Sequence, residues 1–153
     1  MTGRDPRGLL PPLIAFLLFL AAAGPAAAAR SDSVSVEIGV VVASNKGSSI
    51  DPSLSSLRAK LQSMFTYTSY TLLDRKRRSL AVGETGDFSL PGGRSIRVTP
   101  APASGSKVRL AVQIMDGGRN LLTTTLGLSR GGMVLVGGPP HQSGVLILLI
   151  SAE

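Results

Sequence analysis

The densest group of chemically active side chains in this 153-residue sequence is a run of four cations, Arg75-Lys76-Arg77-Arg78. Because a dense basic run attracts anions, it is a candidate polyanion contact. In a eukaryotic protein the same run would also be a dibasic processing site. The alternative is a solvated turn between two strands, which is the usual role of a short basic run. The sequence favours the turn and leaves anion contact as a hypothesis.

Acid–base, metal and nucleophilic chemistry have little support. His141 is the single histidine, and the sequence contains no cysteine. A general base or a metal site needs convergent partners, and none lies near His141 in the sequence. The nearest carboxylate pair, Glu84 and Asp87, falls in a predicted turn, and the phosphate-binding patterns G-x-x-x-x-G-K-[ST] and G-x-G-x-x-G are absent. We therefore expect a protein that is not an enzyme and has no cofactor or metal.

The partner class is narrowed by charge and aromatic content. The net charge is +7. With only two Tyr and four Phe, however, stacking on nucleic-acid bases is not supported. We expect an envelope protein or an anionic envelope polymer as partner, and no nucleic acid.

The first 29 residues are typical of a secretory signal peptide. Arg4 and Arg7 precede an apolar run from Leu13 to Ala23, and Ala27 to Ala29 supply the small residues of a cleavage site. The run is shorter than the roughly 20 apolar residues of a membrane span. We expect cleavage near Arg30 and an exported domain, periplasmic or extracellular, comprising residues 30–153 with no transmembrane span after processing. An uncleaved anchor is the alternative, because the alanines lengthen the apolar run.

The elements that would position the basic residues begin with a strand and a helix. Alternating β-branched residues from Val34 to Val42 predict a strand. Asp51-Pro52 then predicts a helix start, as N-cap and first helical residue. Strand, helix and a second strand over residues 66–74 indicate a crossover unit, right-handed if both strands share one sheet. The predicted helix carries one apolar stripe: Leu54, Leu57, Leu61, Met64 and Phe65.

Short strands and glycine-rich turns fill the rest of the chain. Residues 79–82 and 85–90 predict two strands split by Gly83, and Pro91-Gly92 fits the centre of a type II turn. Residues 95–99 predict another strand. Later glycine pairs predict further turns between strands: Gly117-Gly118, Gly131-Gly132 and Gly137-Gly138.

Strand register follows from matching the apolar faces, since a slip of one residue inverts a strand. Pairing Ile96 with Leu110 sets Arg97 opposite Arg109 on the other face, which makes both arginines candidate polyanion contacts. A three-residue loop at 117–119 is favoured over a two-residue loop, which would mix the faces. This register also sets Val98 opposite Val108, Thr99 opposite Lys107, Ile114 opposite Leu122, Leu110 opposite Leu126, Val108 opposite Leu128, Gln113 opposite Thr123 and Ala111 opposite Thr125. The resulting outer face is rich in threonine and positive at one end, and a face that is simply solvated is the alternative to anion binding, because two arginines can splay into water at little cost.

The final strand, residues 145–152, is apolar on both faces from Val145 to Ile150. A strand of this kind is usually covered on both sides. We expect it inside a sheet, with the helix over one face and upstream strands over the other. The predicted fold class is α+β and β-rich: an antiparallel meander or two-layer β-sandwich with one packed α-helix after the first strand.

Four motifs stand out between Phe65 and Ala152: FTYTSY (residues 65–70), LPGGR (90–94), GGPP (137–140) and GVLILLISA (144–152). Together they resemble the motifs of small exported proteins of unknown function from Gram-negative bacteria of high genomic GC content. The alternating strands that end in a glycine-rich turn are also similar to the β-domain of outer-membrane secretins. The resemblance implies an envelope location and no known activity, and it assigns no functional residues.

Two functions are therefore expected, in this order. The first is a non-catalytic exported envelope protein that acts as a binding or scaffolding β-module. The second is an assembly subunit of a secretion or surface complex that pairs strands with a partner chain. A free sheet edge near Val34 to Val42 would favour the second.

Overall fold

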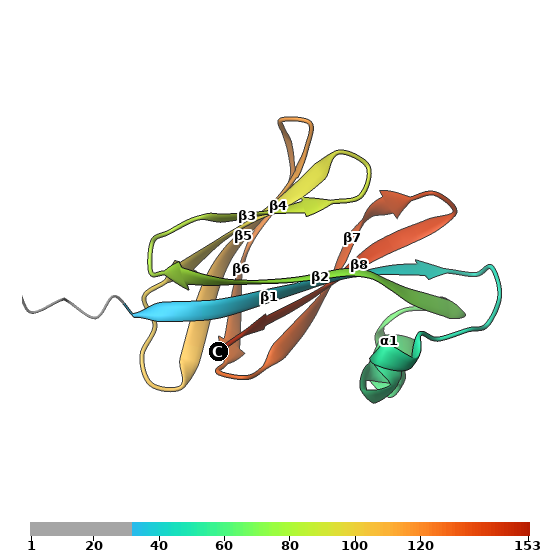
Figure 1. The fold of residues 1–153 in the computed structure, drawn as a ribbon, viewed down its shortest axis with the longest axis horizontal. Helices are drawn as coiled ribbons and strands as arrows, with labels where there is room; N and C mark the ends of the chain where they lie inside the picture. The colour runs from blue at the N-terminus through green and yellow to red at the C-terminus, as the bar shows by residue number, and fades with distance from the viewer. Residues whose placement is uncertain (1–31) are drawn as a thin grey trace, which may run out of the picture. The chain divides into compact units, whose positions relative to one another are not determined.

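The computed structural model describes residues 32–153, which form two four-stranded antiparallel sheets packed face to face (Figure 1). Sheet A has the strand order β2-β1-β8-β7, and sheet B has the order β3-β4-β5-β6. The strands are β1 (Ser33–Ser44), β2 (Ser69–Ala81), β3 (Gly86–Leu90), β4 (Arg94–Ala101), β5 (Lys107–Asp116), β6 (Arg119–Ser129), β7 (Met133–His141) and β8 (Gly144–Ala152). The predicted β-rich class is confirmed, in its two-layer form. The predicted signal peptide lies outside the described residues.

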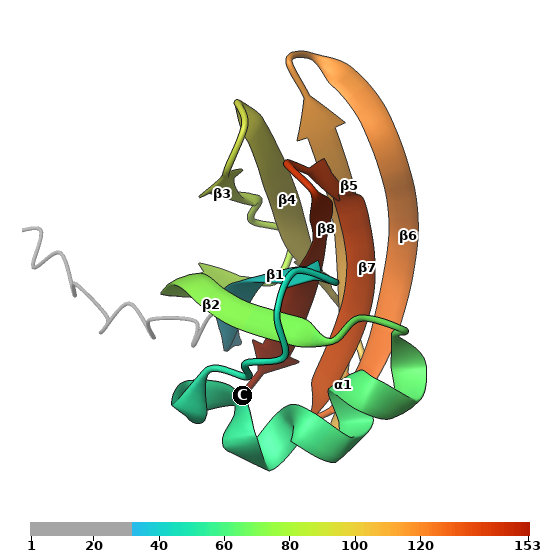
Figure 2. The same ribbon diagram turned by 90° about the vertical axis from the view of Figure 1, so that its right-hand side faces the viewer.

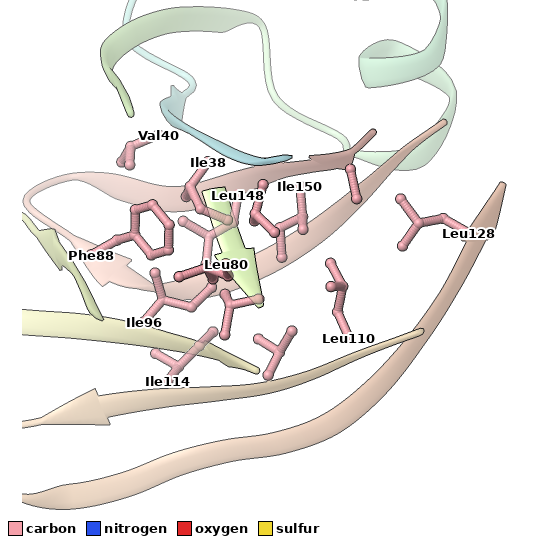
Figure 3. Packing of buried hydrophobic residues seen from close by; sticks show 14 of the residues in the cluster. Ile38, Val40, Leu80, Phe88, Ile96, Leu110, Ile114, Leu128, Leu148 and Ile150 are labelled. Atoms are coloured by element: carbon pink, nitrogen blue, oxygen red, sulfur yellow. The ribbon is translucent and has the colours of Figure 1, made fainter. Parts of the chain in front are cut away.

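The main core fills the space between the sheets (Figure 3). Ile38 and Leu148 from sheet A point toward Ile96, Leu110 and other residues of sheet B, and all four of these side chains are fully buried. Each comes from alternate positions of its strand, so the period-two pattern of the sequence carries the inner face of both sheets.

The connection between β1 and β2 forms a helical cover on the outer face of sheet A. It consists of a 3-10 helix, η1 (Pro52–Leu57), followed by α1 (Arg58–Met64). Asp51 caps the start as predicted, because its carboxylate accepts a 2.9 Å hydrogen bond from the backbone N–H of Ser53. Leu54 and Leu61 are fully buried in a second apolar cluster with Ile147 and Leu149 of β8. Figure 2 shows this cover at the end of the sandwich where the chain passes from α1 into β2.

One residue of the predicted apolar stripe of the helix is not buried. Met64 is 51% exposed, whereas Leu61 is fully buried. The helix ends at Met64, and Phe65 has extended backbone angles but still packs, half-buried, against the same apolar cluster as Leu61. Tyr70 of β2 ties this helix end to sheet A, because its buried hydroxyl lies 3.3 Å from the Leu61 carbonyl oxygen and 3.2 Å from that of Phe65.

The predicted crossover is wrong. β1 and β2 are neighbours in sheet A, but they run antiparallel, so the helical connection joins them without a parallel crossover. The predicted turn at residues 75–78 is also wrong, since β2 continues through it to Ala81. β2 is an edge strand whose side chains are largely exposed there, and exposed strand positions accept charged residues without cost to the core.

The prediction for the last strand is confirmed. β8 lies between β1 and β7, with Leu148 in the core between the sheets and Ile147 under the helical cover. The glycine pair at 137–138 is not a turn but lies within β7, where the pairing with β8 is interrupted before Pro140. Only Gln142 and Ser143 separate β7 from β8.

The β5–β6 hairpin combines the two loop lengths considered from the sequence. The turn itself has two residues, Gly117 and Gly118, with φ angles of 55° and 94° that favour glycine. A register shift between Ile114 and Met115 then supplies the third residue. The expected pairing of Ile114 with Leu122 is therefore correct along the body of the hairpin, and only its tip differs.

The first and last strands pair with each other at the centre of sheet A. β1 pairs with β8 from Val36 opposite Ala152 to Ala43 opposite Val145. Beyond this ladder, Ser35 and Glu153 exchange two backbone hydrogen bonds of 2.8 and 2.9 Å. Among residues 32–153, no helix is both long enough and apolar enough to span a membrane.

Candidate functional site

The candidate site is the outer face of sheet B, which no helix of the described chain covers (Figure 2). Alternate residues of its four strands form rows that cross the sheet. One row, here called the threonine row, runs from Thr85, just before β3, through Thr99 and Ala111 to Thr125. The next row runs through Asp87, Arg97, Gln113 and Thr123. The predicted threonine-rich face is thus present, with the expected partners on β5 and β6.

These two rows line a shallow open depression with a volume of about 360 Å³. Across its floor, the hydroxyl oxygens of Thr85 and Thr99 lie 2.7 Å apart in a hydrogen bond. A surface of hydroxyl and amide groups at the spacing of neighbouring strands can donate and accept hydrogen bonds along an extended ligand. Among its lining residues there is no histidine.

Arg97 sits at this depression but is already paired. Its Nε donates a 3.0 Å hydrogen bond to the Asp87 carboxylate on the adjacent strand. Both side chains are about half exposed, at 49% and 60%, so water screens the pair and it contributes little to stability. The positive charge of Arg97 is largely neutralised for a ligand.

The predicted apposition of Arg97 and Arg109 is wrong. Arg97 lies opposite Gln113, and Arg109 lies opposite Ala101. The actual register keeps the same faces together but moves each pairing along the strands, so periodicity alone could not decide between the two. The chain remains in β4 through Pro100 and Ala101, where Pro100 is buried and its carbonyl oxygen accepts a 2.8 Å hydrogen bond from Gly83 N–H.

The unpaired positive charge lies at the other end of the face. Arg109 and Lys107 alternate on β5 and line an open depression of about 610 Å³ with Pro102, Ala103, Ser104, Val108 and Gly127. Neither cation belongs to any ion pair found among residues 32–153. The predicted positive end is therefore present with Lys107 and Arg109 on one side of β5, as alternation requires, but without Arg97.

The basic run at residues 75–78 does not form one patch. Arg77 donates two hydrogen bonds of 3.1 and 2.8 Å to the Glu37 carboxylate, and Arg75 lies 3.6 Å from the same carboxylate. Lys76 pairs with Asp74 at 3.2 Å. Arg78 instead lies over the Phe88 ring, 5.6 Å from its centroid, in a cation–π contact. Alternation along β2 therefore divides the run between the two sides of sheet A.

His141 ends β7 and is half-buried rather than exposed in a loop as its neighbours in the sequence suggest. Within the described residues, no three His, Cys, Asp or Glu side chains gather as a metal site would require. The expectation of no catalysis stays a prediction.

By fold, this chain is a β-sandwich module with one helical cover. No family model matches the sequence, and no curated protein matches it significantly. Among solved structures it is similar to the T2SS secretin XcpQ from Pseudomonas aeruginosa, with a TM-score of 0.34 and 12% sequence identity. The match covers 78% of this chain and 55% of the secretin chain, so this chain spans about half of that chain's length. The neighbour is a secretin, the class that the alternating strands of the sequence resemble.

Proposed function

We propose that this domain is a non-catalytic, exported envelope module that binds an anionic polysaccharide across the outer face of sheet B. The observation that carries the proposal is the pair Lys107 and Arg109, both free of ion pairs among the described residues, at one end of the hydroxyl-lined rows. An anionic polysaccharide presents both kinds of group that such a face recognises: negative charges for the two cations and hydroxyls for the threonine row.

Three other cations that the sequence singles out are already held by carboxylates. Arg75 and Arg77 already share the Glu37 carboxylate, and Arg97 is held by Asp87. A ligand that bound any of these three would have to compete with an internal carboxylate. Lys107 and Arg109 require no such exchange, which makes them the favoured anion contact.

The test measures binding of the full-length exported protein to anionic polysaccharide, lipopolysaccharide and vesicles of anionic lipid at low salt. We expect polysaccharide binding that falls as ionic strength rises toward about 0.15 M, where screening over roughly 8 Å takes effect. The double variant Lys107→Gln/Arg109→Gln should bind about tenfold more weakly or worse, because two charge-assisted contacts are lost. Binding to lipid vesicles alone would indicate a membrane surface instead.

The matched control is Arg58→Gln/Lys60→Gln on α1, which removes the same net charge from exposed or half-exposed positions far along the chain from sheet B. It should bind as the wild type does. Equal weakening by both double variants would show a general effect of net charge. No binding by the wild type to any of the three anionic ligands would refute the proposal.

A further inference from the structure

The four edge strands of the sandwich differ in how well they are protected from pairing with another chain. β2 carries the basic run at residues 75–78, and β7 carries Pro139 and Pro140, which lack an N–H. β3 has only five residues. Charge, proline and short length are the features that keep natural sheet edges from adding a strand.

β6 has none of these features. It is an edge of sheet B with 11 residues, and it contains neither charge nor proline from Asn120 to Ser129. In Figure 2, β6 lies at the margin of the sandwich, and within residues 32–153 no strand pairs with its outer side. A long, uncharged edge with free backbone donors and acceptors is a template for a further strand.

The sequence of β6 is complementary to itself. Residues 122–126 read Leu-Thr-Thr-Thr-Leu, which is symmetric about Thr124. If two copies pair antiparallel about Thr124, Leu122 of each lies opposite Leu126 of the other, and Thr123 lies opposite Thr125. Leucine then meets leucine on one face and threonine meets threonine on the other, which are both favourable cross-strand pairs. Because paired residues share the same parity, the outward backbone groups of the two strands also match.

Shape and charge fit the same register. Leu121, which is 43% exposed, would lie opposite Gly127 of the second copy. Gly127 has open space where a side chain would be, with nothing within 4 Å. Arg119 would lie opposite Ser129, so no cation on β6 faces another. The same two-fold pairing of β2 about its basic run would instead set cations against cations.

We propose that two copies of this chain associate through β6, antiparallel about Thr124, and join their B sheets into one continuous sheet. The interface is isologous, as two-fold dimers require, since the same segment serves both partners. Association through β6 does not depend on the proposed polysaccharide binding. It would, however, set the threonine rows of the two copies side by side on one longer face.

The test uses sedimentation equilibrium of the full-length protein over a concentration series. The wild type should show a reversible monomer–dimer equilibrium. The variant Thr123→Lys/Thr125→Lys sets two lysine pairs in opposition and should weaken dimerisation roughly tenfold or more. The variant Thr123→Lys/Thr125→Glu sets lysine opposite glutamate in this register and should dimerise at least as well as the wild type.

The comparison of the lysine–lysine variant with the lysine–glutamate variant separates an effect on pairing from an effect on folding, because both variants change the same two exposed positions. Circular dichroism and urea melts should show equal folding of the two. A wild type that stays monomeric up to millimolar concentration would overturn the proposal. So would equal dimerisation of the two variants, which would locate the interface elsewhere. Loss of polysaccharide binding without loss of the dimer would bear on the proposed function alone.

Discussion

The two outer faces of the sandwich differ in how far they are covered. Part of the outer face of sheet A lies under the helical cover, where Leu54 and Leu61 pack on Ile147 and Leu149 in an apolar cluster. The rest of that face carries the exposed Arg75 and Arg77 beside Glu37. The outer face of sheet B presents threonine, glutamine and cations to solvent. One face contributes to stability and the other is free to bind, so substitutions on the two faces should have separable effects.

The difference can be read in two strands. β8 is apolar at consecutive positions from Val145 to Ile150, because both of its sides are covered. β5 alternates strictly, with Val108, Leu110 and Val112 buried and the intervening residues exposed or half-buried. A strand with a continuous apolar run is therefore covered on both faces, and a strand with an alternating pattern has one face exposed to solvent.

The largest expected effect removes the cover. Leu61→Ala should destabilise the protein by about 2–5 kcal/mol, because the fully buried side chain leaves a cavity between helix and sheet. Leu57→Ala should cost less, since Leu57 is only half-buried. Urea melts measure both, with Arg58→Ala as the neutral control on the same helix. Equal, small effects at all three positions would show that the helix does not dock.

A smaller effect is expected where the cover is fastened. Tyr70→Phe removes the hydroxyl that bonds the carbonyl oxygens of Leu61 and Phe65 and leaves these acceptors without that partner. We expect a loss of about 1–3 kcal/mol in the free energy of unfolding. If Tyr70→Phe melts as the wild type does, water or a shifted helix end replaces the hydroxyl.

Substitutions on the outer face of sheet B should change the free energy of unfolding only slightly. Arg97→Ser breaks the solvent-exposed pair with Asp87 and should alter the free energy of unfolding by no more than about 1 kcal/mol. The same variant should retain most polysaccharide binding, because the charge it loses is already neutralised. A loss as large as that of Leu61→Ala would contradict the division between the two faces.

The smallest effect concerns the start of the cover and depends on pH. Hydrogen bonds from the hydroxyl and backbone N–H of Ser53 lower the pKa of Asp51 from its usual value of 3.8. Its charged form therefore adds stability above about pH 3.8 that is lost as pH falls through the folded-state pKa. The stability difference between wild type and Asp51→Ala should shrink in acid, as measured by melts from pH 6 to about pH 2. A constant difference would mean that Asp51 acts without its charge.

Much of the fold could be predicted from local patterns. Alternation located the strands and the wet face, the Asp51-Pro52 pair located the helix start, and the apolar run at 145–150 located the covered strand. Alternation and the apolar run succeed because they depend only on which side of a strand is buried, and the Asp51-Pro52 signal succeeds because capping is local to the backbone.

What failed depends on tertiary context. The basic run suggested a turn, yet it lies within β2, since an edge strand can hold charges on both faces. The apposition of Arg97 with Arg109 failed because two registers bury the same residues, and only the extension of β4 through Pro100 separates them. A free edge near Val34 to Val42 would have favoured strand pairing with a partner, but β1 lies inside sheet A, and β6 is an edge of sheet B. Pairing partners, unlike faces, are not encoded in a strand's own periodicity.

The pairing of β1 with β8 at the centre of sheet A also sets the order in which the protein can fold. Val36 pairs with Ala152, so the ladder at the centre of the sheet joins residues from opposite ends of the described chain. Contacts of such high sequence separation give a high contact order and slow folding, because the entropy of closing a long loop is lost before the pairing is gained. The hairpins of β5 with β6 and β7 with β8 can form early, but sheet A is complete only when the last strand is free to join.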